Sequence, residues 1–150
     1  MTADVNHIKL KRLSLGAVVF LTVAALAFAV TSAFAANLSC PPDCTGTAGS
    51  DTINGNGNNN NIDARGGDDS VYGNGGHDAE DGEGGSDGLV DDHGNDTIRG
   101  GDGASDVSWG IADSGTDDLY GGANNGDQCY YDVSIGNDNV DSTCEQKIPY

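Results

Sequence analysis

The 150-residue sequence predicts an all-β repeat protein, and three observations support that prediction. Large apolar residues recur every nine positions through a region rich in glycine and aspartate, and aspartate and glycine keep fixed distances from them. The chain has 24 glycines and a formal net charge of −18, and large apolar residues are scarce in its glycine-rich region. A packed core made from side chains alone is not expected for such a composition. Either the chain is disordered in pure water, or bound cations complete its structure.

Residues 1–35 have the pattern of a signal peptide. Lys9, Lys11 and Arg12 precede a long uncharged apolar run, which ends in the small-x-small sequence Ala33-Phe34-Ala35. We expect cleavage after this sequence, secretion to the extracellular space and no membrane insertion of the mature chain. The alternative is an uncleaved anchor that keeps the protein at the cell surface, because the apolar run is long enough to span a bilayer.

All four cysteines follow the predicted leader, two in a short N-terminal segment (residues 36–45) and two near the C-terminal end. An even number of cysteines in an exported chain favours disulfides over free thiols. Three pairings are possible, and we favour the one that would staple the two ends of the mature chain: Cys40–Cys44 and Cys129–Cys144. Residues 142–150 would then form a C-terminal cap.

The repeat occupies residues 46–141. Its apolar lattice positions are Ile53, Ile62, Val71, Leu89, Ile98 and Val107, with Glu80 in the slot between Val71 and Leu89. Aspartate stands two residues before most of these positions and glycine four residues before. The register slips by three residues twice, after which Leu119 and Val140 resume the apolar column. Three columns held in phase over this length argue against a disordered low-complexity tract.

The repeated unit resembles the GGxGxDxUx nonapeptide of the RTX (hemolysin-type) calcium-binding repeats, most closely in "GEGGSDGLV" and "GNGGHDAED". The resemblance covers most of the chain beyond the leader. It implies a parallel β-roll, which is a β-solenoid, with two units per coil and disulfide-bearing ends as caps. It also implies Ca²⁺ between stacked turns, held by aspartate carboxylates and turn carbonyls. Oxygen ligands of this kind suit Ca²⁺, which accepts six to eight of them in flexible geometry.

The predicted calcium ligands are the aspartates of one column, which would face each other one coil apart: Asp51, Asp69, Asp78, Asp87, Asp96, Asp117 and Asp138. Asn60 lacks the carboxylate, so a site there would be weaker. Ser105 also lacks it, although Asp106 would substitute if the turn shifted, and Asp127 is similarly placed.

Two inward rows are expected, one with Ile53, Val71, Leu89 and Val107 and the other with Ile62 and Ile98. Glu80 falls in the second row, where an ionised side chain would be costly. At that coil we expect a local distortion or a polar seam.

The function predicted from these features is a secreted calcium-binding protein that folds as it binds Ca²⁺. The alternative is a cell-surface or extracellular adhesin, or a structural spacer, stiffened by calcium. The sequence has no basic patch, so nucleic acid is not an expected partner. It identifies no protein or carbohydrate partner. Ser86 lies in "GGSDG", which matches the G-x-S-x-G nucleophile motif, but it fills a variable repeat position without the required α/β domain. We therefore expect no enzymatic activity.

Overall fold

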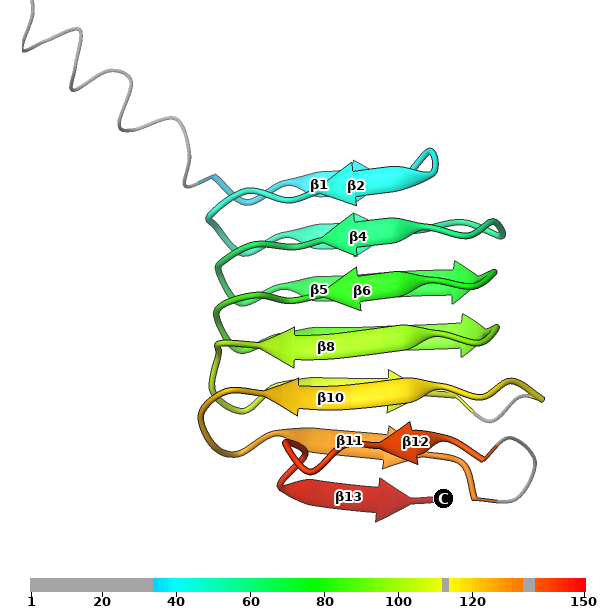
Figure 1. The fold of residues 1–150 in the computed structure, drawn as a ribbon. Coiled ribbons are helices and arrows are strands. Elements are labelled where there is room, and N and C mark those ends of the chain that lie inside the picture. The colour runs from blue at the N-terminus through cyan, green and yellow to red at the C-terminus, as the bar shows by residue number, and fades with distance from the viewer. Residues whose placement is uncertain (1–33, 112–113, 134–136) are drawn as a thin grey trace, which may run out of the picture. The chain divides into compact units, whose positions relative to one another are not determined.

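The computed structural model describes residues 34–111, 114–133 and 137–150. Residues 1–33 of the predicted signal peptide (residues 1–35) therefore lie outside the described residues. All regular secondary structure in these ranges is β-strand. The strands stack in parallel as a β-solenoid of about six turns, which confirms the predicted fold class (Figure 1). The described ranges contain no helix of the length and hydropathy needed to cross a membrane.

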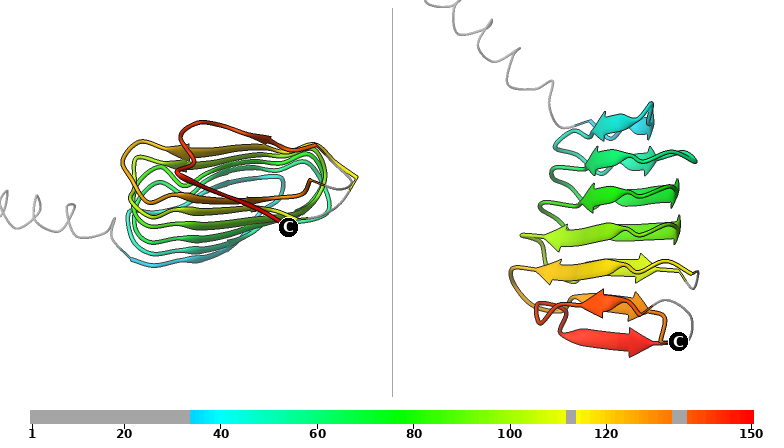
Figure 2. Two further views of the ribbon diagram at one scale, coloured as in Figure 1. Left: turned by 90° about the horizontal axis from the view of Figure 1, so that it is seen from below. Right: turned by 45° about the vertical axis from the view of Figure 1, so that its right-hand side comes forward.

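The strands alternate between two parallel sheets. The seven-stranded sheet contains β1 (Asn37–Ser39), β3 (Thr52–Asn54), β5 (Ser70–Gly75), β7 (Gly88–His93), β9 (Val107–Gly110), β11 (Gln128–Tyr131) and β13 (Gln146–Pro149). The six-stranded sheet contains β2 (Asp43–Thr45), β4 (Asn61–Asp63), β6 (Ala79–Asp81), β8 (Thr97–Gly101), β10 (Asp118–Gly122) and β12 (Asn139–Val140). Viewed along the axis, the coils superpose as flattened loops (Figure 2). Each coil therefore has two strands joined by two turns.

Each sheet directs one row of side chains into the interior. The row of the seven-stranded sheet aligns Leu38, Ile53, Val71, Leu89, Ser108 and Cys129. The row of the six-stranded sheet aligns Cys44, Ile62, Glu80, Ile98, Leu119 and Val140. The two predicted three-residue insertions are confirmed, because Ile98 pairs with Leu119 and Leu119 with Val140.

The predicted inward position of Val107 is wrong. Leu89 pairs with Ser108, and Val107 pairs with Gly88 instead. The turn before β9 has one extra residue, which Ser105 accommodates with a left-handed φ of 68°. The extra residue allows the Asp106 carboxylate, rather than Ser105, to accept the buried Asp87 N–H at 2.9 Å. An unpaired buried amide and carboxylate would cost more than a partly exposed valine, so the carboxylate sets the register.

The apolar interior of the described residues forms two clusters, a larger one that runs from the first coil to β8 and a smaller one in the last coils. The larger one contains Cys40, Ile53, Ile62, Ala64, Val71, Leu89 and Ile98, and the smaller one Leu119, Cys129 and Cys144. The favoured disulfide pairing is confirmed, with Cys40–Cys44 in the first cluster and Cys129–Cys144 in the second. Ser108 lies between the clusters, so the apolar stack is interrupted there.

Candidate metal centre

Two columns of acidic residues run along the stack, one through each set of turns. Each member lies immediately before a strand. The column before the seven-stranded sheet, which we call the first ladder, contains Asp51, Asp69, Asp87, Asp106 and Asp127. The column before the six-stranded sheet, the second ladder, contains Asn60, Asp78, Asp96, Asp117 and Asp138. Because the strands are parallel and in register, ladder members of successive coils lie one above the other.

One oxygen of each ladder carboxylate is bonded to the backbone of the preceding coil. In the first ladder, the N–H of Asp51 donates to Oδ1 of Asp69 at 2.7 Å, and the N–H of Asp69 donates to Oδ1 of Asp87 at 2.8 Å. The same bond continues down both columns with lengths up to 3.1 Å. These bonds join the coils, so the carboxylates contribute to the stack whether or not an ion is bound.

The second oxygen of several ladder carboxylates has no partner within the protein. This holds for the Oδ2 atoms of Asp69, Asp78, Asp87, Asp106 and Asp127. Each of these residues is buried, with no more than 3% of its surface exposed. Leaving a buried carboxylate oxygen unpaired is expensive, because neither water nor a donor replaces its lost hydration. The unpaired oxygens therefore require a proton or a cation.

Burial also changes the acidity of these groups. Loss of hydration raises the pKa of Asp69, Asp78 and Asp106, and it raises the pKa of Asp87 to about 7. Bonds from backbone N–H groups act in the opposite direction but do not cancel the effect of burial. Neighbouring carboxylates, such as Asp106 beside Asp87, raise the pKa further. Mutual repulsion and burial thus favour neutralisation of the ladder.

Turn carbonyls lie close to the unpaired oxygens. At Gly82, an added Cβ would collide with both the Asp87 Oδ2 atom and the carbonyl oxygen of Gly100, one coil further on. The same pairing of a ladder oxygen with a carbonyl occurs at Gly100, between Asp106 and Gly121. Carboxylate and carbonyl oxygens gathered without nitrogen or sulfur are the donor set of a hard cation. The residues present therefore fit Ca²⁺.

The ends of the ladders differ from their middles. Asp51 has both oxygens bonded, because Oδ1 accepts from the N–H of Ala36 at 2.6 Å and Oδ2 from the N–H of Thr47 at 2.6 Å. At the other end, Asp138 accepts from the N–H groups of Asp117 and Asp132 at 3.1 and 2.8 Å. Protein donors thus satisfy both oxygens of Asp51 and Asp138, whereas one oxygen each of Asp69, Asp78 and Asp87 has no such donor.

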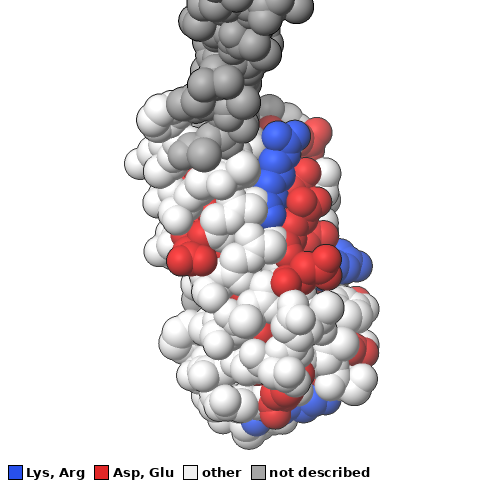
Figure 3. Space-filling view, turned by 90° about the vertical axis from the view of Figure 1, so that its left-hand side faces the viewer, with Lys and Arg blue, Asp and Glu red and all other residues white. Residues whose placement is uncertain are grey.

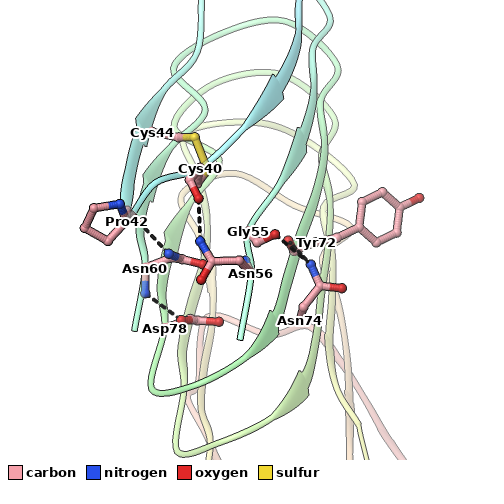
Figure 4. Close-up of a disulfide and its surroundings, with 9 residues drawn as sticks. All are labelled: Cys40, Pro42, Cys44, Gly55, Asn56, Asn60, Tyr72, Asn74 and Asp78. Carbon is pink, nitrogen blue, oxygen red and sulfur yellow. Dashed lines mark hydrogen bonds between the residues drawn. A yellow bond between two sulfur atoms is a disulfide. The ribbon is translucent and has the colours of Figure 1, made fainter. Parts of the chain in front are cut away.

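Asn60 ends the second ladder in the same way, next to the first disulfide (Figure 4). Its side-chain Nδ2 donates to the Pro42 carbonyl at 2.6 Å, and its Oδ1 accepts from the N–H of Asn56 at 2.7 Å. Its own N–H continues the column to Asp78 at 2.7 Å. An amide at this position therefore satisfies both of its polar ends without an ion. This agrees with the expectation that any site here is weak.

Glu80 and Asp91 add two acids that the ladders do not contain. Glu80 is fully buried in the inward row, as predicted, and Asp91 is 1% exposed. Carboxylate oxygens of Asp78, Asp91 and Asp96 all lie within 4.8 Å of one another. We call Asp78, Glu80, Asp91 and Asp96 the interior cluster. The sequence signalled Glu80 because it interrupts an apolar column, but Asp91 interrupts a glycine column and was missed.

The exposed faces also carry charge, but of both signs. Acidic side chains gather along the stacked turns on one face, with basic side chains beside them (Figure 3). A groove on the solenoid is lined by Arg65, Arg99, Glu83 and Asp102, among others. The Arg99 guanidinium lies over the Tyr120 ring, 5.1 Å from its centroid. The exposed charges are thus partly balanced, whereas the buried charged residues of the described ranges are all acidic.

The seven predicted ligands divide according to these contacts. Asp69, Asp78 and Asp87 have an unpaired buried oxygen, Asp51 and Asp138 are satisfied by protein donors, and Asp96 and Asp117 continue the second ladder. Asp106 and Asp127, which were not among the seven, take equivalent positions in the first ladder. No protein family, curated protein or solved structure matches this chain. Its carboxylate geometry is therefore the basis for inferring a function.

Proposed function

We propose that this chain is a calcium-binding repeat protein of the RTX type, without enzymatic activity, whose folding is coupled to Ca²⁺. The observation that carries the proposal is the set of buried, unpaired Oδ2 atoms along the ladders, repeated coil after coil. Asp69, Asp87, Asp106 and Asp127 would hold ions in the first ladder, together with carbonyls of the adjoining turns. Asp78, Asp96 and Asp117 would do so in the second.

The bound ion would supply positive charge where the fold brings carboxylates together. A ligand that binds only the folded state stabilises it by mass action. Extracellular calcium modules bind at roughly 0.1 to 1 mM, a range in which secreted proteins are loaded and cytoplasmic ones are not. The proposal therefore includes secretion, which the two disulfides favour because such bonds persist in oxidising compartments.

Titration of the oxidised protein with Ca²⁺, followed by far-UV circular dichroism, tests this function. Starting from metal-stripped buffer near neutral pH, we expect a cooperative gain of β signal at roughly millimolar Ca²⁺ or below. The same titration with Mg²⁺ is the control, and it should produce little change because Mg²⁺ requires a tighter octahedral site. A spectrum that stays disordered at saturating Ca²⁺, or that is already fully β without metal, would overturn the proposal.

A second candidate, adhesion to carbohydrate by a calcium-stiffened roll, is favoured by an aromatic row on the seven-stranded sheet. Register places Tyr72, Val90, Trp109 and Tyr130 in one column, and the rings of Trp109 and Tyr130 stack with centroids 4.5 Å apart. Trp109 is 40% exposed. Flat exposed aromatic surface suits the apolar faces of sugar rings. Loss of binding to insoluble polysaccharide in a Trp109→Ala variant would support this candidate, and no binding by the parent would exclude it.

A further inference from the structure

Glu80 and Asp91 depart from the repeat at neighbouring points of the interior. Glu80 stands between Ile62 and Ile98 in the inward row of the six-stranded sheet. Asp91 lies eighteen residues after Gly73 in the sequence, but a shift of register in β5 pairs it with Asn74 in the preceding coil, and it pairs with Gly110 in the next coil. The other coils place apolar or small residues at these positions, and an acid at both within one level of the stack requires a reason.

The two acids meet the second ladder at Gly73. An added Cβ on Gly73 would lie 2.7 Å from Oε1 of Glu80 and 2.8 Å from Oδ2 of Asp78, and it would also collide with Oδ2 of Asp91. Asp96, one coil below Asp78, brings a fourth carboxylate to within 4.8 Å of Asp78 and Asp91. The absence of a side chain at Gly73 thus leaves room on which carboxylate oxygens converge from two successive coils.

Protein groups do not compensate this concentration of charge. Glu80 is fully buried and neither of its oxygens makes a hydrogen bond of ordinary geometry; the nearby N–H of Gly73 lowers its pKa by less than burial raises it. The Oδ2 atoms of Asp78 and Asp91 have no partner other than each other. Among the described residues the only ion pair is the exposed one between His93 and Asp92. Buried carboxylates left without partners cost several kcal/mol each as ions, so a cation or protons must neutralise the cluster.

We propose that Asp78, Glu80, Asp91 and Asp96 form an interior calcium site, in addition to the sites in the turns. This inference rests on the proposed calcium-binding function and adds a specific site to it. The Oδ1 atom of Asp78 stays bonded to the backbone of the preceding coil, which leaves its Oδ2 atom available to the interior. The Oδ1 atom of Asp96 makes the same bond, and a carboxylate oxygen of Asp96 lies within 4.8 Å of those of Asp78 and Asp91. The second ladder therefore shares two of its members with the cluster.

The spacing and the number of the oxygens suit Ca²⁺. Ca²⁺ binds oxygen at 2.3 to 2.6 Å, so ligands on opposite sides of one ion lie up to about 5 Å apart. The oxygens of Asp78, Asp91 and Asp96 all lie within 4.8 Å of one another, which is inside this span. Glu80 offers two oxygens without an ordinary hydrogen bond, and Asp78 and Asp91 offer one each. Asp96 and water would bring the set to the six to eight ligands that Ca²⁺ accepts, whereas Mg²⁺ requires a stricter octahedron.

Protons compete with the ion for these oxygens. Burial, together with Asp96 and Asp78 nearby, raises the pKa of Asp91 to about 8. Burial and the charges of Asp91, Asp78 and Asp96 raise the pKa of Glu80 well above its usual value. A cation that binds the cluster must therefore displace protons from Asp91 and Glu80.

The decisive measurement is the number of calcium ions bound per folded chain, by equilibrium dialysis and by native mass spectrometry. The test variant is Glu80→Ile with Asp91→Gly, because these changes restore the residues that the same columns carry elsewhere. It should fold, as judged by far-UV circular dichroism in saturating Ca²⁺, and bind one ion fewer than the parent. The matched control is Asp81→Asn with Asp92→Asn, which removes two negative charges outside the cluster and should leave the ion count unchanged.

An equal ion count in the test variant and the parent would overturn the interior site while leaving the turn sites intact. A parent that binds no calcium at all would overturn both this inference and the proposed function. The single variant Asp91→Asn keeps the size of the side chain and removes one charge, so it guards against a folding defect in the double variant. It should also lose one ion, or bind it with at least tenfold weaker affinity, and an unchanged affinity would contradict the proposal.

Discussion

The central ladder aspartates and the two acids outside the ladders, Glu80 and Asp91, are all buried, but the backbone supports them differently. Each central ladder carboxylate accepts an N–H bond from the coil before it, and this bond recurs at every coil. Glu80 occurs once, and the N–H of Gly73 lowers its pKa by less than burial and the neighbouring carboxylates raise it. A repeated carboxylate can therefore be part of the architecture, whereas one outside the repeated series depends on a bound ion or a proton that neutralises it.

A change of pH should give the largest effect, because it acts on the ladder aspartates and on the interior acids together. The pKa values of Asp87 and Asp91 are raised to about 7 and about 8, so the folded chain binds more protons than the unfolded chain above pH 4. Stability without metal is therefore greatest below the usual carboxyl pKa and falls as pH rises to 8. The far-UV β signal of the metal-free chain, measured at pH 5, 6, 7 and 8, should therefore decrease steadily as the chain unfolds.

The Glu80→Ile and Asp91→Gly variant refines that measurement. It should lose the decrease between pH 7 and 8, and below pH 7 it should keep only the smaller decrease that the ladders contribute, because Asp91 and Glu80 lower the stability of the parent from their unfolded pKa values upward. In saturating Ca²⁺ the parent should show no such decrease, because the ion replaces the protons. A parent β signal that does not change with pH in metal-stripped buffer would contradict the raised pKa values.

Steric substitution should give the next largest effect. Alanine at Gly82 would collide with the Gly100 carbonyl, which is backbone and cannot move away, and with Asp87. We expect a loss of about 3 kcal/mol in the free energy of unfolding, measured with urea in saturating Ca²⁺. At Gly73 the three atoms nearest to an added Cβ are side-chain oxygens of the cluster and not backbone, so the loss on substitution by alanine should be smaller.

Gly57→Ala is the control for these two variants, because an added Cβ there has no neighbour within 4 Å. It should change the free energy of unfolding by less than about 0.5 kcal/mol. If Gly73→Ala proved as costly as Gly82→Ala, the interior cluster would be as rigid as the ladder corners.

The smallest effect compares two positions of the same ladder. Asp69→Asn retains an acceptor for the Asp51 N–H but removes a charge whose Oδ2 has no protein partner. It should raise the Ca²⁺ midpoint about tenfold, since calcium affinity follows the number of charged ligands. Asp51→Asn should change that midpoint less than about twofold, because protein donors already satisfy both oxygens of Asp51. Equal shifts for the two variants would place ions at the ladder ends as well.

Much of the fold could be predicted because the repeat encodes it directly. The apolar lattice located the inward residues, including Leu119 and Val140 after each insertion. It failed at Val107, because spacing alone does not show that hydrogen bonding of the Asp106 carboxylate outweighs burial of one valine. Competition between two local preferences is decided by their energies, and these depend on the three-dimensional partners.

The site was predicted less completely, for a related reason. The column of aspartates identified the ladder, but it could not show which oxygens the backbone would satisfy. Asp51 and Asp69 look alike in the sequence, but the N–H of Thr47, in the same coil, donates to Oδ2 of Asp51, whereas Oδ2 of Asp69 has no donor. Asp91 went unnoticed because one acid in a glycine column is a weak signal until Glu80 is seen beside it.

The ladder bonds have a consequence for how such a protein changes over evolutionary time. Each ladder carboxylate accepts its repeated N–H bond from the coil before it, at a spacing of 18 residues in the regular part. Duplication or deletion of one whole coil between Asp69 and Asp87 would recreate the same contacts at the new junction. Loss or gain of a single nine-residue unit would instead exchange the two columns. The whole coil, rather than the nine-residue unit, is therefore the unit by which this chain can lengthen or shorten.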